Sequence, residues 1–249
     1  MGGGGFTMEP VGGALDEFVL GLSRSPVPRI CFLPTASGDP SEQITRFHAA
    51  FAGRPCEPVH LSLFRLGAHP VDLRELLLSQ DIVYVGGGSM RNMLAIWRAH
   101  GLDEILRECW EQGTVLAGLS AGAMCWFEGG ITKSSGAPAP VEGLGLLPGS
   151  LSVHLDGEPD RRRPFIDAVT SGALPSGYAA DDGVALLWEG RELTRVVGSK
   201  PGLQCIRVEP GGVSEVPVGS LSSRPPVLRS LDADVRELRS LRYRASAGR

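Results

Sequence analysis

The sequence has no long apolar run, no paired-cysteine motif and no strong excess of charge of either sign. A membrane-spanning helix needs about 20 consecutive apolar residues, and the N-terminus, which begins MGGGGFTMEP, lacks the basic and apolar segments of a signal peptide. The formal net charge of −4 gives no electrostatic attraction toward nucleic acid or an anionic membrane surface. We therefore expect a cytoplasmic protein that binds neither nucleic acid nor a membrane.

Cofactor and metal motifs are missing as well. The five cysteines form no CxxC pair and join no histidine at metal-ligand spacing, which is typical of reduced cytosolic thiols. The glycines 86–88 are followed by Arg91 and Asn92, so neither a dinucleotide fingerprint nor a Walker lysine is present. The sequence predicts a chemistry without metal or cofactor.

Short apolar runs alternate with helical patterns over the first half of the chain. The 249 residues, 42% of them hydrophobic, suffice for one domain spanning 1–249 with one substantial core. Apolar strands separated by helices predict a parallel sheet covered on both faces. The expected strands are 29–35, 57–63, 81–88 and 114–118, and the expected helices are 41–52, 71–79 and 91–110.

After residue 150 the alternation of apolar runs with helical patterns gives way to a segment rich in predicted strands. Two strands joined by a turn at 189–191 are expected within 178–199, followed by a strand at 204–208. Leucine and valine at helical spacing predict an amphipathic helical tail at 227–249, whose mixed charges are typical of a solvated face. Because open α/β sheets bind ligands at the carboxyl ends of their strands, the loops after residues 34, 85 and 118 are the places to look for a site.

The stretch Gly118-Leu119-Ser120-Ala121-Gly122 satisfies the pattern G-x-S-x-G, with a predicted strand before it and a helix after it. A sharp turn there exposes the serine hydroxyl and aims the amides of the following helix at a developing oxyanion. The alternative is a small-residue turn that packs helix on strand.

A nucleophilic serine needs a base, and His154 is the only histidine after Ser120. It lies between a proline-glycine turn and a cluster of charges, although a structural or surface role is the alternative. No histidine lies beyond it, which disfavours the α/β-hydrolase order of serine, acid and C-terminal histidine. The N–H group of Gly88, at the end of a neighbouring strand, is a candidate oxyanion donor, with a plain strand-to-helix turn as the alternative.

The glycines 2–5 raise a separate question. A glycine-rich loop of this kind normally follows a first strand, yet Met1 directly precedes it. Either that strand is missing before Met1, or the glycines form a flexible lead.

Several longer motifs follow one another in a single order: CFLPTASGD, VYVGGGSMRNML, AGLSAGAMCWFE, LGLLPGSLSVHLDGE and YAADDGVAL. Together they resemble the peptidase E (dipeptidase E) and cyanophycinase family of serine peptidases, from the first glycines to about residue 210. The resemblance implies a class I glutaminase-like α/β fold, a three-layer sandwich with a mostly parallel sheet. It also implies Ser120 as nucleophile, His154 as base, and the N–H groups of Gly88 and Ala121 as oxyanion donors.

Peptidase E cleaves dipeptides with an N-terminal aspartate and holds that side chain with an arginine downstream of the histidine. Arg161, Arg162 and Arg163 occupy the corresponding region, and we favour Arg162, with a solvated helix start as the alternative. The implied partner is a small peptide substrate, bound by a monomer or a homodimer.

One position departs from the family pattern. Relatives carry an acid about 20 residues before the histidine, where this chain has Lys133. Glu142, Asp156 or Glu158 could take its place. Three functions stay open: a dipeptidase that prefers N-terminal aspartate, a cyanophycinase-like β-aspartyl hydrolase, and a binding domain that lost catalysis with the acid.

Overall fold

The structure is a computed structural model that describes residues 1–8 and 13–221. The helical tail expected at 227–249 lies outside the described residues. Four parallel strands form the first sheet in the order β2-β1-β3-β4. They are β1 (Arg29–Leu33), β2 (Glu57–His60), β3 (Ile82–Val85) and β4 (Val115–Gly118). Each coincides with one of the predicted apolar runs.

Alternate side chains of these strands fill two separate cores. On β1, Ile30 and Phe32 pack in one core with residues of α1 (Ala14–Leu20) and α2 (Ser41–Phe51). Cys31 and Leu33 pack in the other, against helices on the opposite face. Because side chains of a strand alternate between faces, each face of the sheet needs its own apolar cover. The second cover consists of α3 (Leu73–Leu78), α4 (Met90–Ala99) and α5 (Leu102–Glu111).

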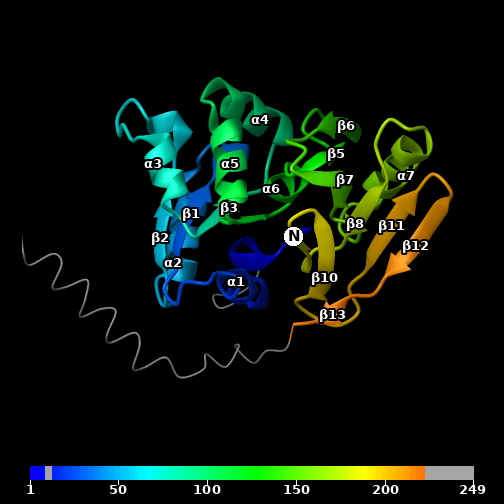
Figure 1. The fold of residues 1–249 in the computed structure, drawn as a ribbon. Coiled ribbons are helices and arrows are strands. Elements are labelled where there is room, and N and C mark those ends of the chain that lie inside the picture. Colours follow the sequence, from blue (N-terminus) through cyan, green and yellow to red (C-terminus); the bar gives the residue numbers. More distant parts are fainter. Residues whose placement is uncertain (9–12, 222–249) are drawn as a thin grey trace, which may run out of the picture.

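Two helix layers around a parallel sheet confirm the predicted α/β sandwich (Figure 1). The single helix expected at 91–110 is wrong in one respect, because the chain forms α4 and α5 with a break between them. Gly101 adopts a left-handed φ of 66° at that break and precedes the first residue of α5. Glycine reaches this conformation without steric cost, so the apolar periodicity runs across a turn.

The second half of the chain is rich in strands and forms two further sheets, ordered β12-β11-β8-β7-β5-β6 and β13-β10-β9. The predicted hairpin is confirmed as β9 (Val184–Glu189) and β10 (Glu192–Gly198), and the following strand is β11 (Cys205–Glu209). The remaining elements are β5 (Phe127–Thr132), β6 (Ala139–Glu142), β7 (Leu147–Val153), β8 (Gly177–Ala180), β12 (Gly212–Val216), β13 (Gly219–Ser220), α6 (Ala121–Met124) and α7 (Arg162–Thr170). Four short 3-10 helices complete the described residues: η1 (Gly5–Thr7), η2 (Thr35–Ser37), η3 (Leu63–Arg65) and η4 (Pro159–Arg161).

The N-terminal glycines lie in the interior. Residues Gly2 to Phe6 are buried, and the N-terminus sits between the two halves of the molecule (Figure 1). The N–H of Gly2 donates to the carbonyl of Val184, which ties this stretch to β9. The glycines are thus packed and hydrogen-bonded, unlike a flexible lead. None of the helices in the described ranges is long and apolar enough to cross a membrane.

Candidate active site

Ser120 lies in a sharp turn between β4 and α6, at the carboxyl end of a parallel strand. Its φ of 52° and ψ of −113° are unusual for a residue with a side chain, and such a backbone costs about 1–3 kcal/mol of strain. The turn depends on close backbone approach. A Cβ added at Gly118 would overlap the Gly122 carbonyl, and one added at Gly122 would lie 2.5 Å from the carbonyl oxygen of Val85.

His154 follows β7 and also has a left-handed backbone, with φ of 59°. Its Nε2 lies 2.8 Å from Oγ of Ser120. The structure therefore brings together the two residues that the sequence predicts as nucleophile and base. The contact joins a turn of the parallel sheet to the end of a strand in the second sheet.

Asp182 completes a chain of hydrogen bonds that the sequence analysis did not predict. Its Oδ1 lies 2.5 Å from Nδ1 of His154, on the far side of the ring from Ser120. An ionised carboxylate only accepts hydrogen bonds, so Nδ1 carries the proton and Nε2 is free to accept the serine hydroxyl proton. The arrangement has the roles and order of a serine–histidine–acid triad.

The three acids that the sequence offered as partners of His154 have other surroundings or contacts. Glu142 is exposed on β6, and Glu158 forms ion pairs with Lys133 and Arg161. Asp156 accepts a hydrogen bond of 3.0 Å from the backbone N–H of Asp182, so it supports the loop from behind. The carboxylate that is hydrogen-bonded to Nδ1 of His154 is instead that of Asp182.

A signal for Asp182 was present in the sequence. The sequence predicted one continuous strand before the turn at 189–191. In the structure this segment is interrupted at Asp181-Asp182-Gly183, between β8 and β9, where Gly183 has a φ of 84°. Two carboxylates and a glycine inside an apolar run are typical of an interruption at a loop. The same break orients the Asp182 side chain toward His154.

The two amides expected as oxyanion donors lie at the same edge of the sheet. Ala121 is the first residue of α6, and Gly88 follows β3 with a φ of 139°. Within the part of the chain that the structure describes, neither N–H donates a hydrogen bond. The glycine loop lies against the serine, since a Cβ at Gly87 would come within 3.3 Å of Cβ of Ser120. Their role as donors stays a prediction.

A cavity of about 280 Å³ opens beside Ser120. Arg161 lines it, and its side chain is only 9% exposed, with Nε donating to Oε2 of Glu158 at 2.9 Å. Arg162 is exposed and is not among the lining residues, so the cavity gives no support to the choice of Arg162. Successive helical residues point about 100° apart, so only one of three adjacent arginines can face the cavity. The remaining lining residues are Gly88, Ser89, Met124, Thr132, Lys133 and Ser134.

Lys133 adds a second cation to the rim of this cavity. Its Nζ lies 3.2 Å from Oε2 of Glu158 and 3.0 Å from Oδ2 of Asp160. These contacts raise the pKa of Lys133 and lower the pKa of Asp160, mainly through their shared hydrogen bond. Among the described residues, no group of three or more histidine, cysteine, aspartate or glutamate side chains is placed to hold a metal.

Comparison with known proteins places this geometry in a family. The model of Peptidase family S51 matches residues 1–196. The chain is 49% identical over 208 residues to the uncharacterized peptidase YgaJ of Bacillus subtilis (strain 168), covering 84% of this chain and 90% of that protein. It is also 31% identical over 134 residues to the imidazole glycerol phosphate synthase subunit HisH of Geobacillus thermodenitrificans (strain NG80-2), covering 46% of this chain and 61% of the subunit.

Among solved structures, a crystal structure of a peptidase from an acI-B1 Actinobacterium shares the fold. Its TM-score is 0.68 at 19% identity, with 88% of this chain and 93% of that chain covered. The family match spans the strands that carry Ser120, His154 and Asp182. The resemblance seen in the sequence motifs is thereby confirmed, and the chain belongs to Peptidase family S51, a family of serine peptidases.

Proposed function

We propose that the protein is a serine dipeptidase that removes an acidic N-terminal residue through an acyl-enzyme. The observation that carries the proposal is the hydrogen-bond series from Oγ of Ser120 through His154 to Asp182. Ser120 attacks the scissile carbonyl while Nε2 of His154 accepts its proton. Asp182 holds the ring in the required tautomer and stabilises the imidazolium that forms.

The oxyanion of the tetrahedral intermediate accepts hydrogen bonds from the N–H groups of Gly88 and Ala121, which have no competing acceptor among the described residues. His154 then gives its proton to the leaving amine, and the acyl-enzyme remains on Ser120. Water, deprotonated by the same imidazole, hydrolyses that ester and restores the hydroxyl. No step needs a metal or a cofactor.

The size and charge of the cavity support a short, acidic substrate. Its volume of about 280 Å³ lies near the lower limit of small-molecule sites. Arg161 uses three of its five N–H donors within the described residues, two toward Glu158 and one toward the carbonyl of Ile131. The other two are free to bind a substrate carboxylate, and burial strengthens that contact.

An activity-based probe tests the reaction class. A fluorophosphonate should phosphonylate Ser120, with loss of fluoride, because only an activated serine attacks such a phosphorus centre at an appreciable rate. We expect labelling of the unmodified chain, confirmed by peptide mass spectrometry, and none in His154→Ala. Absence of labelling in the intact, folded chain would instead support a binding domain without catalysis.

Substrate charge is tested with matched arginine variants. Arg161→Ala should lower kcat/KM for Asp-Leu by about 10- to 100-fold, the usual loss for a charged hydrogen bond. Hydrolysis of the neutral isostere Asn-Leu should change much less. Arg162→Ala is the control, because its exposed side chain is outside the cavity and both substrates should retain their rates.

The ratio of kcat/KM for Asp-Leu to kcat/KM for Asn-Leu decides whether Arg161 gives the cavity its preference for an acidic residue. If Arg161→Ala leaves the preference for Asp-Leu over Asn-Leu unchanged, the acidic specificity of this cavity is wrong. Preferred cleavage of β-aspartyl-arginine over Asp-Leu would favour the cyanophycinase-like alternative.

A further inference from the structure

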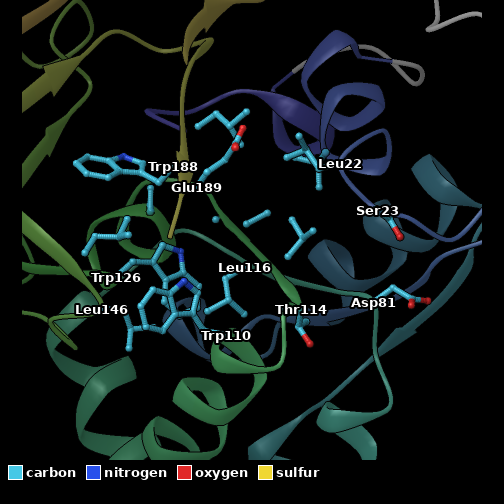
Figure 2. Close-up of a pocket in the computed structure, with 18 of the residues that line it drawn as sticks. Leu22, Ser23, Asp81, Trp110, Thr114, Leu116, Trp126, Leu146, Trp188 and Glu189 are labelled. Atoms are coloured by element: carbon cyan, nitrogen blue, oxygen red, sulfur yellow. The ribbon is translucent and has the colours of Figure 1, made fainter. Parts of the chain in front are cut away.

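Two cavities in the described part of the chain differ in their chemistry. The larger, of about 1090 Å³, is lined by Trp110, Trp126 and Trp188, and no residue of the triad is among those that line it (Figure 2). The smaller, of about 280 Å³, contains the reactive serine and two cations, Arg161 and Lys133. Selection of a substrate by its charge therefore belongs to the smaller cavity.

Lys133 is the residue at which the chain departs from the family pattern, and the mechanism above gives it no role. It directly follows β5, and hydrogen bonds between its two neighbours order the backbone there. The N–H of Ser134 donates to Oγ1 of Thr132 at 3.2 Å, and the two hydroxyl oxygens lie 2.7 Å apart. The lysine side chain thus leaves the strand from a fixed turn at the rim of the cavity.

The carboxylate of Glu158 joins the two cations. Its Oε2 lies 3.2 Å from Nζ of Lys133 and accepts a hydrogen bond of 2.9 Å from Nε of Arg161. Arg161 also donates to the carbonyl of Ile131, within β5, at 3.5 Å. One carboxylate oxygen therefore divides its charge between two cations, and both cations are held at the end of the same strand.

Without Lys133, the carboxylate of Glu158 would be paired with Arg161 alone. The Arg161 side chain is only 9% exposed, so water and salt screen this ion pair weakly. A guanidinium whose charge is balanced by a carboxylate attracts a second carboxylate less strongly. Glu158 would then compete with an acidic substrate for the same arginine.

The formal charges of the cluster lead to the same conclusion. Lys133 and Arg161 face two carboxylates, Glu158 and Asp160, and Asp160 is 57% exposed and in contact with water. Hydrogen bonds to Asp160 and Glu158 raise the pKa of Lys133, so the ammonium stays charged at neutral pH. Removal of Lys133 would leave one cation beside two carboxylates, and such a cluster repels an acidic side chain.

We propose that Lys133 determines the preference of this cavity for an acidic residue, because it neutralises Glu158 and leaves the charge of Arg161 for the substrate carboxylate. The inference rests on the proposed function, since it concerns the electrostatics of the same subsite. Lys133 acts through two other side chains, so it is a positioning residue. Asp182 contacts His154, and the lysine at the position of the family acid serves the substrate side chain.

The test measures binding in chains that all carry Ser120→Ala, so that no turnover occurs. Calorimetry gives the Kd of Asp-Leu and of its neutral isostere Asn-Leu, and the ratio of the two values reports selection by charge. We expect Asp-Leu to bind about tenfold or more tightly in the chain with Ser120→Ala alone. Addition of Lys133→Met should lower this ratio by about five- to tenfold, whereas Lys133→Arg should keep it, because the positive charge remains.

A further substitution distinguishes action through Glu158 from direct contact of Lys133 with the substrate. Glu158→Gln removes the carboxylate charge, and the amide oxygen still accepts a hydrogen bond from Nε of Arg161. The chain with both Lys133→Met and Glu158→Gln should therefore recover the original ratio to within about threefold. Asn-Leu should bind all of these chains with a similar Kd, which also confirms that each chain is folded.

An unchanged ratio in the Lys133→Met chain would overturn the inference. A ratio that falls and is not restored by Glu158→Gln would overturn it too, because Lys133 would then bind the substrate carboxylate itself. Both outcomes leave the proposed function in place, since the chain with Ser120→Ala alone still prefers Asp-Leu. If that chain binds the two dipeptides equally or binds neither, the acidic specificity of the proposed function is wrong, and this inference is wrong with it.

Discussion

Replacing Ser120 by alanine should lower kcat/KM for Asp-Leu by about 10⁴-fold or more, the loss seen when the nucleophile of a serine triad is removed. Within residues 1–8 and 13–221, the Ser120 hydroxyl is the one group hydrogen-bonded to Nε2 of His154, at 2.8 Å, so these residues offer no second nucleophile in that place. The free energy of unfolding should stay within about 1 kcal/mol of that of the unmodified chain, because the substitution removes one side-chain hydrogen bond.

Ser134→Ala is the matched control for this prediction. Ser134 lines the same cavity, but its hydroxyl bonds to Thr132 and not to His154. Its loss should change kcat/KM by no more than a few-fold. Undiminished hydrolysis by Ser120→Ala, measured on protein freed of contaminating peptidases, would falsify the mechanism.

Asp182→Asn should lower kcat by about 10⁴-fold with little change in stability. The amide cannot stabilise an imidazolium, and its NH₂ group can donate to Nδ1, which would leave the proton on Nε2 and block acceptance from Ser120. Steady-state kinetics with Asp-Leu measures the loss. Since geometry is preserved, KM should change far less than kcat.

Asp156→Asn provides the comparison. Asp156 supports the loop by accepting from the Asp182 backbone, and the carbonyl oxygen of asparagine accepts the same bond. We expect a loss of about tenfold at most. A large loss in Asp156→Asn beside an active Asp182→Asn would reverse the two roles.

The sheet and the serine–histidine pair could be predicted because local patterns determine them. Four runs of strand length predicted the strands of the first sheet. The strands β1 and β3 are buried along nearly their whole length, as expected for strands covered on both faces, whereas the edge strand β2 is largely exposed. Gly118 and Gly122 flank Ser120 because only small residues permit the close approach at the turn. His154 followed from elimination, as the only histidine after the serine.

The positions of Asp182 and Arg161 could not be predicted from local sequence patterns. Asp182 meets His154 because β7 and β8 are neighbours in a parallel pair, a contact that adjacency along the chain does not reveal. The choice of Arg161 over Arg162 depends on the angle at which α7 begins, and one residue decides which side chain faces the cavity. Both depend on tertiary register, whereas sequence periodicity reports local conformation.

The bond from the Ser120 amide to the Met1 carbonyl has a practical consequence for handling the protein. Residues added or removed at this end of the sequence would act next to Ser120 and, through Gly3, next to the carboxylate of Asp182. Preparations that differ only in their first residues should therefore be compared separately in every assay.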